Sequence, residues 1–219
     1  MTTVPADPAD RWVAGSYGLR ITGLPGASDL LGRVRADAPA LHLSLLPGAG
    51  SNGAGEVGLD RASLLLRDGS RFDVDRVSAR AVLTTSQDLT QDDLVHPSLA
   101  PAAALVQQWH GREALHAGAF LVDGEAVLVL ADKEGGKSST LGHLAMEEGV
   151  AVLADDLAIL DGDRVLAGPR CLDLRPLTAQ TYADRWQGRL VRSGSRTRLE
   201  LSGALPDAGL GAGVVLAWG

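Results

Sequence analysis

The chain has 219 residues, of which 45% are hydrophobic and 21% charged, and its formal net charge is -7 at pH 7. An acidic chain argues against nucleic acid as the main partner, and no apolar run reaches the roughly 18 residues of a membrane helix. The single cysteine, Cys171, excludes an internal disulfide. Because the N-terminus lacks a secretory signal, we expect a cytoplasmic protein.

β-structure dominates the prediction for residues 1–95, which we interpret as a β-rich N-terminal module. Apolar runs and alternating patterns predict strands that are separated by turns rich in glycine, proline and aspartate. Substrate docking and completion of one side of a sheet both stay open as roles for this module. The expected segments are a frayed terminus over 1–15, strands over 17–22 and 40–46, a flexible glycine-rich loop over 47–55, two or three antiparallel strands over 57–84, and a polar boundary over 86–93.

The second part of the chain, residues 96–219, begins with a predicted amphipathic helix. It starts at His96-Pro97 and ends near His110, and its apolar face comprises Leu99, Ala103, Leu105, Val106 and Trp109. A strand beginning at His116 then leads to a hairpin turn at Asp123-Gly124.

A strand, a loop, a helix and a second strand are predicted next. Ala126 to Ala131 is a buried strand, and Gly135-Gly136-Lys137-Ser138 opens a helix with apolar Leu141 and Leu144. A second short strand, Val150 to Ala154, ends in the carboxylate pair Asp155-Asp156. This order is typical of a nucleotide phosphate site.

The chemistry of such a site explains the residue types. A helix start offers unpaired N–H groups and a positive dipole end to anions. Lys137 places its charge on the β- and γ-phosphates, and the Ser138 hydroxyl reaches Mg²⁺. We expect the ATP phosphates to lie on Glu134, Gly135, Gly136, Lys137, Ser138, Ser139 and Thr140.

The two carboxylates divide the remaining roles. We assign Asp155 as the general base that takes the acceptor proton and Asp156 as a ligand of Mg²⁺ together with Ser138. Adjacent strand residues face opposite sides, so both acids reach the site only if the strand ends there. A turn or helix-cap carboxylate is the structural alternative for the pair.

The C-terminal stretch predicts a strand over 157–160, a turn at Asp161-Gly162, a strand at Val165-Leu166 and a helix over 177–186. Five arginines from residue 185 onward form the densest basic stretch, which we interpret either as a solvated loop or as a mobile clamp for the nucleotide or an acidic substrate. They are Arg185, Arg189, Arg192, Arg196 and Arg198. A final buried strand is expected over 213–218, where the chain stops before elements that related kinases carry.

His116, Gly136-Lys137-Ser138 and Asp155-Asp156 resemble, in this order, the catalytic core of the HPr serine kinase/phosphorylase family and its kinase-like relatives. The resemblance covers about residues 112–175. It implies an α/β fold of the phosphoenolpyruvate carboxykinase type, in which a mixed central β-sheet carries a P-loop strand–loop–helix core. It also implies that His116 contacts the transferred phosphate or tunes the nearby Asp. A similar Pro-Arg segment in the family implies that Arg170 or Arg175 contacts the nucleotide.

Several residues depart from the family pattern. Ala131 replaces the first glycine of the phosphate loop, and Glu134 would repel phosphate unless it points away or is neutralised by Lys133. Ser139 stands where the bifunctional enzymes carry a glutamate, and the segment tied to phosphorylase activity has no counterpart here. The resemblance therefore implies a kinase of this superfamily, but not HPr as its substrate.

Together these features predict an ATP- and Mg²⁺-dependent kinase that transfers the γ-phosphate to a hydroxyl group. A serine of a peptide or protein is the favoured acceptor, because the β-rich N-terminal module offers strand addition. A small-molecule hydroxyl kinase and a non-catalytic nucleotide-binding module are the alternatives. No membrane partner is expected, and assembly into a homo-oligomer stays open.

Overall fold

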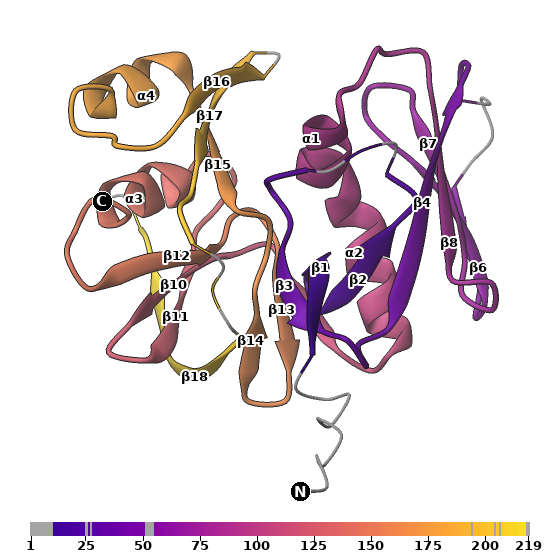
Figure 1. Cartoon of the computed structure of the whole chain (residues 1–219), viewed down its shortest axis with the longest axis horizontal. Coiled ribbons are helices and arrows are strands. Elements are labelled where there is room, and N and C mark those ends of the chain that lie inside the picture. The colour runs from indigo at the N-terminus through magenta and orange to yellow at the C-terminus, as the bar shows by residue number, and fades with distance from the viewer. Residues whose placement is uncertain are drawn as a thin grey trace, which may run out of the picture.

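The computed structural model describes residues 11–24, 26, 28–50, 55–193, 195–203, 205 and 207–217. Within these ranges the chain forms two large mixed β-sheets, a small antiparallel sheet and few helices (Figure 1). The expected α/β class with mixed sheets is therefore confirmed. Residues 1–10, residues 51–54 of the expected glycine-rich loop, Gly194 in the arginine-rich stretch and Trp218 in the expected last strand lie outside the described residues.

The first part of the chain builds an eight-stranded sheet with the order β3-β1-β2-β4-β8-β7-β6-β5. Strands β2, β4 and β8 run parallel, whereas the other pairs are antiparallel. The strands are β1 (Trp12–Ser16), β2 (Leu19–Thr22), β3 (Gly32–Arg35), β4 (Ala40–Pro47), β5 (Glu56–Val57), β6 (Arg61–Leu65), β7 (Arg71–Asp75) and β8 (Arg80–Thr85). The β-rich prediction for this part is confirmed.

The start of this sheet differs from the sequence prediction. Residues 12–15, expected to be frayed, belong to β1, and Tyr17 lies in the β1–β2 turn with a φ of 56° instead of in a strand. The Tyr17 side chain is fully buried. Burial of its ring among hydrophobic residues of both large sheets holds the hairpin in place, which a local pattern cannot indicate.

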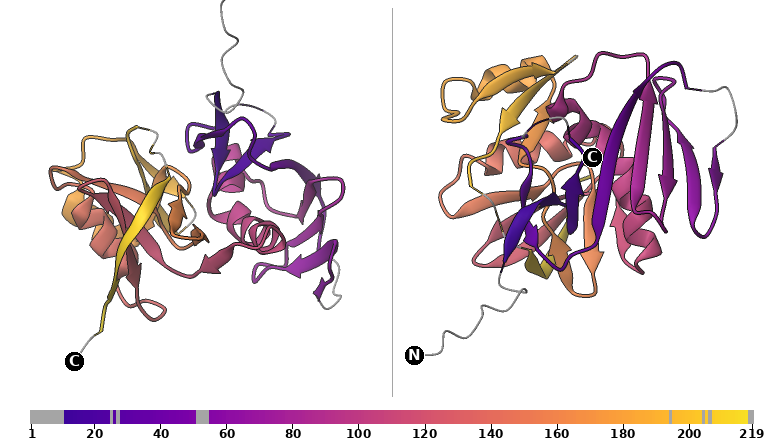
Figure 2. Two further views of the ribbon diagram at one scale, coloured as in Figure 1. Left: turned by 90° about the horizontal axis from the view of Figure 1, so that it is seen from below. Right: turned by 45° about the vertical axis from the view of Figure 1, so that its right-hand side comes forward.

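Helix α2 (Leu99–Trp109) follows a short helical turn, α1 (Gln91–Asp93), and an irregular helical segment, η2 (Leu94–Ser98). One apolar cluster contains Phe72 and Leu83 of the eight-stranded sheet, Leu99 of α2, and Ile159 and Leu166 from the second sheet. Helix α2 therefore packs between the two sheets, as the turned views show (Figure 2). The expected helix is confirmed, although it begins three residues later than predicted. The division of the chain at residue 95 stays a prediction.

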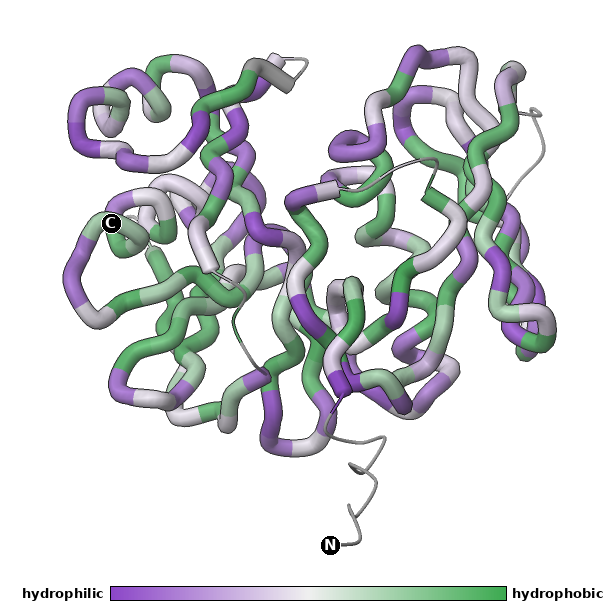
Figure 3. The backbone as a smooth tube through the Cα atoms, viewed as in Figure 1, coloured by the Kyte–Doolittle hydropathy of each residue, from purple (hydrophilic) through white to green (hydrophobic). Residues whose placement is uncertain are grey.

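The second large sheet has seven strands in the order β12-β10-β11-β18-β14-β13-β9. Strands β10, β11 and β12 of this sheet are rich in hydrophobic residues (Figure 3). The strands are β9 (Glu113–Leu115), β10 (Gly118–Val122), β11 (Glu125–Leu130), β12 (Val150–Ala154), β13 (Ala158–Asp161), β14 (Arg164–Leu166) and β18 (Ala208–Val215). Helix α3 (Lys137–Leu144) follows β11 and contributes Leu141 to the core.

Strand β12, which precedes the two acids, is not the direct neighbour of β11. Strands β10 and β11 form a hairpin around Asp123-Gly124, and β12 pairs antiparallel with the other edge of β10. Because β10 is antiparallel to both of its neighbours, β11 and β12 run in the same direction. Both therefore end at the same edge of the sheet, the one formed by their carboxyl ends. The loop after β11 and Asp155 after β12 therefore meet at this edge.

A small sheet and helix α4 (Pro176–Tyr182) cover this edge. The sheet has the order β15-β17-β16 and consists of β15 (Cys171–Leu174), β16 (Leu190–Ser193) and β17 (Arg196–Glu200). Much of the arginine-rich stretch is thus strand, not loop, and the expected helix over 177–186 is shorter than predicted. In the part of the chain that the structure describes, no helix is both long and apolar enough to cross a membrane.

Candidate functional site

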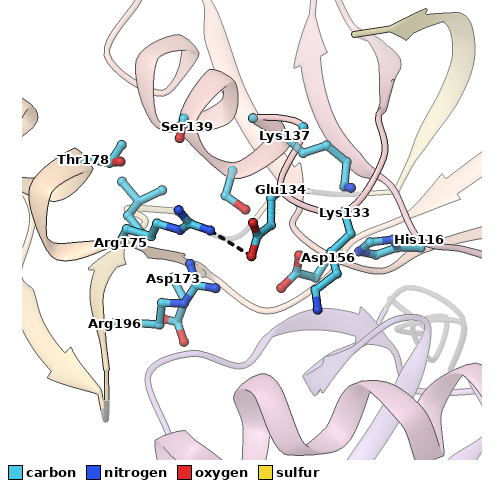
Figure 4. A pocket seen from close by; sticks show the side chains of 14 residues that line it. His116, Lys133, Glu134, Lys137, Ser139, Asp156, Asp173, Arg175, Thr178 and Arg196 are labelled. Carbon is cyan, nitrogen blue, oxygen red and sulfur yellow. Dashed lines mark ion pairs between the residues drawn. The ribbon is translucent and has the colours of Figure 1, made fainter. Parts of the chain in front are cut away.

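A cavity of about 490 Å³ lies between the loop that follows β11 and the β15–α4 segment (Figure 4). Its walls include Lys137 and Ser138 at the start of α3, Asp156 after β12, and His116 between β9 and β10. Most of the residues selected from the sequence pattern thus line one cavity, although they come from four separate segments of the chain.

Backbone geometry explains the glycines of the Gly-Lys-Ser loop (residues 131–138). Gly136 precedes the first turn of α3 with a φ of 90°, a conformation that favours glycine. A Cβ atom at Gly135 would lie 2.7 Å from the Ala131 Cβ and 2.9 Å from the Asp132 carbonyl oxygen. The chain therefore folds back tightly on itself before the helix, and the Gly135 N–H donates to the Asp132 carbonyl oxygen at 2.9 Å within this return.

Lys137 is buried, with 6% of its surface exposed. Its ammonium group donates to the carbonyl oxygens of Ala131, at 2.9 Å, and of Asp132, at 3.4 Å. Both acceptors are neutral, so the charge of Lys137 is solvated by loop carbonyls and not neutralised by an acid in these contacts. An anion entering the helix mouth would find this charge available.

A hydrogen bond joins the loop to the acid pair. The Ser138 hydroxyl donates to Oδ1 of Asp155 at 3.0 Å, and the Asp156 N–H donates to the same oxygen at 3.0 Å. Oδ2 of Asp155 is buried without a hydrogen-bond partner. Burial, and then the nearby Asp156 carboxylate, raise the pKa of Asp155 to about 7.

The neighbouring Asp156 has a different environment. Its φ of 62° turns the chain away from the strand direction, so its side chain is exposed and lines the cavity. There it lies close to His116 and Lys133 (Figure 4). The strand does end at the acid pair, as the prediction for two usable acids required, but one acid lies beneath the loop and the other faces the cavity.

Glu134, the residue that departs most from the resembled pattern, forms an ion pair with Arg175. The Arg175 Nη2 lies 2.9 Å from Oε1 of Glu134, and both side chains are more than half exposed. The sequence had suggested Lys133 as the neutralising residue, but the partner in the structure is Arg175, because the start of α4 lies opposite the loop. Such an exposed pair contributes about 0–1 kcal/mol to stability, so a competing anion can separate it.

Two of the predicted contacts lie elsewhere. Arg170 does not line the cavity. Its side-chain Nη2 donates to the Leu201 carbonyl oxygen at 3.0 Å, and its backbone N–H donates to the Leu30 carbonyl oxygen. Thr140 lies one turn along α3, where its N–H donates to the Gly136 carbonyl at 2.8 Å, and it also does not line the cavity.

Sequence reasoning missed Asp173 and Thr178, and had treated Arg196 as one member of a basic stretch. All three line the cavity with Arg175. Asp173 and Arg196 come from paired strands of the small sheet, and long-range pairing of this kind leaves no local signal.

The donor set fits a hard divalent cation. Ser138, Asp155 and Asp156 offer hydroxyl and carboxylate oxygens, the ligands that Mg²⁺ prefers.

The sequence matches no family model, and no curated protein is significantly similar to it.

Proposed function

We propose that this chain is an ATP-dependent kinase that transfers the γ-phosphate to a hydroxyl group. The observation that carries the proposal is the 3.0 Å hydrogen bond from Ser138 to Asp155, which joins a Gly-Lys-Ser loop to an acid pair at the edge of one cavity. With the order of His116, the loop and the acids, it supports a P-loop core of the HPr kinase type.

In this proposal the phosphates lie on the N–H groups at the start of α3. Lys137 exchanges its contacts with the Ala131 and Asp132 carbonyls for phosphate oxygens. The Glu134–Arg175 pair opens, which allows Arg175 to approach the γ-phosphate while Glu134 turns to solvent. These movements concern side chains at the cavity surface and leave the sheet unchanged.

The environments of the acids favour an exchange of the roles that their order in the sequence suggested. Asp155 is bonded to Ser138 and has a free buried oxygen, so with Ser138 it would hold Mg²⁺. When bound, Mg²⁺ would neutralise charge on the phosphate oxygens. Asp156 faces the cavity beside His116, and in this proposal it takes the acceptor proton.

The reaction forms a bond between the acceptor oxygen and the γ-phosphorus and breaks the bond from that phosphorus to the β–γ bridging oxygen of ATP. The acceptor proton passes to Asp156, and ADP leaves with the bridging oxygen. Most of the catalysis in such a transfer comes from positioning and charge stabilisation. We therefore expect Lys137 to matter more than any single peripheral arginine.

A serine of a peptide or protein remains the favoured acceptor class. The cavity opens beside polar and charged groups, and within the described part of the chain β3 is an edge strand of the eight-stranded sheet that pairs on one side only, with β1. An extended peptide could add to such an edge through main-chain hydrogen bonds. Small hydroxyl compounds are the alternative acceptors.

A second function, a non-catalytic nucleotide-binding module, is favoured by one observation. The Glu134 carboxylate lies at the phosphate loop and pairs with Arg175. In a kinase this arginine would contact a phosphate instead. This module would bind ATP with no turnover of any acceptor.

Transfer from radiolabelled ATP to a panel of serine peptides and small hydroxyl compounds separates these functions. We expect transfer with the unaltered chain and a loss of at least about a hundredfold in Lys137→Ala, comparable to the removal of one preorganised charge contact. His143→Gln, on the exposed face of α3, is the matched control and should retain activity. Nucleotide binding without transfer to any acceptor would favour the binding module, and no binding at all would exclude both functions.

A further inference from the structure

A second group of reactive side chains lies next to the cavity, where the η2 segment meets the small sheet. His96 comes from η2, and Cys171 and Asp173 from alternate positions of β15. One ligand atom of each lies within 4.8 Å of the others, and among the described residues they are the one group of His, Cys and acidic side chains with this property. The phosphoryl-transfer proposal uses none of the three.

The imidazole of His96 lacks the partners that its burial requires. The residue is 1% exposed, and neither ring nitrogen has a hydrogen-bond partner. An unsatisfied buried polar atom costs about 1–3 kcal/mol, so such a group calls for an explanation. Nε2 is 3.7 Å from Oδ2 of Asp173, too far for a hydrogen bond.

That distance does suit two ligands of one metal ion. Zinc bonds of about 2.0–2.3 Å in a tetrahedral arrangement place neighbouring ligand atoms roughly 3.3–3.8 Å apart. The Cys171 sulfur lies within 4.8 Å of the other two atoms, so a small movement brings all three to this spacing. Imidazole nitrogen with thiolate sulfur is a ligand set that selects zinc over Mg²⁺ or Ca²⁺.

Arg198 at first sight opposes a cation here. This buried guanidinium binds Asp173 through Nε at 2.8 Å and Nη2 at 3.1 Å, and its Nη1 lies 3.6 Å from Asp93. However, hydrogen-bonded carboxylates are common metal ligands, and the outer partner fixes their orientation. A dication with Arg198 brings three positive charges, which the Cys171 thiolate, Asp173 and Asp93 balance.

We propose that His96, Cys171 and Asp173 form a zinc site that ties the η2 segment to the small sheet. Asp173 also lines the large cavity, which gives the ion a path from solvent. Binding releases the thiol proton to solvent, and a water molecule or hydroxide takes the fourth position. The site is separate from the Ser138–Asp155 pair, and it can exist whether or not the chain transfers phosphate.

Cobalt titration of the untagged, metal-stripped chain tests the proposal, because cobalt bound to a thiolate absorbs through sulfur-to-metal charge transfer. Cys171 is the only cysteine, so any such band must come from this residue. We expect the band to saturate at one cobalt per chain, to disappear on addition of one equivalent of zinc, and to be absent in Cys171→Ser.

A second variant keeps the test decisive if the cysteine variant does not fold. His96→Gln should weaken cobalt binding by more than about tenfold, because losing even an outer partner of a ligand costs about tenfold or more and His96 is a direct ligand in this proposal. It should also abolish the rise in melting temperature that zinc produces in the unaltered chain. His143→Gln, which changes an exposed histidine, should bind as the unaltered chain does. A folded unaltered chain without the band, or full affinity in His96→Gln, would overturn the proposal.

Discussion

Asp155 and Asp156 show how strongly the surroundings of a residue determine its chemistry. They are adjacent in the chain, yet Asp155 is 1% exposed beneath Ser138, whereas Asp156 is exposed in the cavity. The positive φ of Asp156 separates them. The sequence predicted that both acids serve one site, but the assignment of roles depended on this turn, which no residue pattern indicated.

The raised pKa of Asp155 predicts a pH dependence of stability. Between the unfolded value of 3.8 and the folded value of about 7, the folded chain binds more protons at this residue than the unfolded chain does. Stability from Asp155 is therefore greatest below pH 3.8 and is lost as the pH rises to 7.

The variant Asp155→Asn should not lose stability in this way as the pH rises, because it has no carboxyl group at this position. Without nucleotide or Mg²⁺, its free energy of unfolding relative to the unaltered chain should increase by roughly 2–3 kcal/mol between pH 5 and pH 8, since one pKa unit corresponds to about 1.4 kcal/mol. Urea denaturation at the two pH values measures this change. If the free energies of unfolding of the variant and the unaltered chain differ by the same amount at pH 5 and pH 8, burial does not destabilise the charged carboxylate.

At the scale of elements, predictions held where the signal was local. The hydrophobic runs of β11 and β12 and the Asp123-Gly124 turn form as expected, because each depends on a few consecutive residues. The small sheet was missed. The sequence predicts a solvated loop or a mobile clamp around Arg196 and Arg198. In the structure Arg198 is buried and pairs across the sheet with Asp173, 25 residues earlier. Asp173, which lines the cavity from this sheet, was missed for the same reason.

The tight return of the Gly-Lys-Ser loop predicts the effect of one added methyl group. In Gly135→Ala the new Cβ would meet the Ala131 Cβ at 2.7 Å, so the loop must move. Overpacking of this kind costs about 1–3 kcal/mol, which we expect to appear as nucleotide affinity weakened about tenfold or more. Calorimetric titration with an ATP analogue measures the affinity. Gly209→Ala is the control, because no atom lies within 4 Å of its Cβ position; equal affinities of the two variants would contradict the account of the loop.

For the molecule as a whole, Arg198 connects parts that are far apart in the chain. Besides Asp173, its Nη2 donates to the His96 carbonyl at 2.6 Å, so one buried guanidinium joins the small sheet to the η2 segment. The apolar cluster around α2 provides a second connection between the two large sheets. Contacts between residues far apart in the sequence thus hold the segments that form the walls of the cavity.

Loss of the Arg198 charge should be costly. In the presence of a chelator, Arg198→Met should lower the free energy of unfolding by about 3–5 kcal/mol, because Asp173, whose side chain is only 10% exposed, is left without its partner. Arg189→Met removes an ion pair with Glu200 in which the arginine side chain is 65% exposed, and it should cost less than about 1 kcal/mol. Denaturation curves of both variants give the comparison, and similar losses would show that burial of Arg198 does not determine its contribution.

The most direct test of the kinase proposal is a crystal structure with Mg²⁺ and a non-hydrolysable ATP analogue. We expect the phosphates on the N–H groups at the start of α3, Lys137 in contact with the β- and γ-phosphates, Mg²⁺ on the Ser138 hydroxyl beside Asp155, and Asp156 facing the γ-phosphate. A nucleotide bound elsewhere, with Lys137 still on the Ala131 carbonyl, would contradict the account.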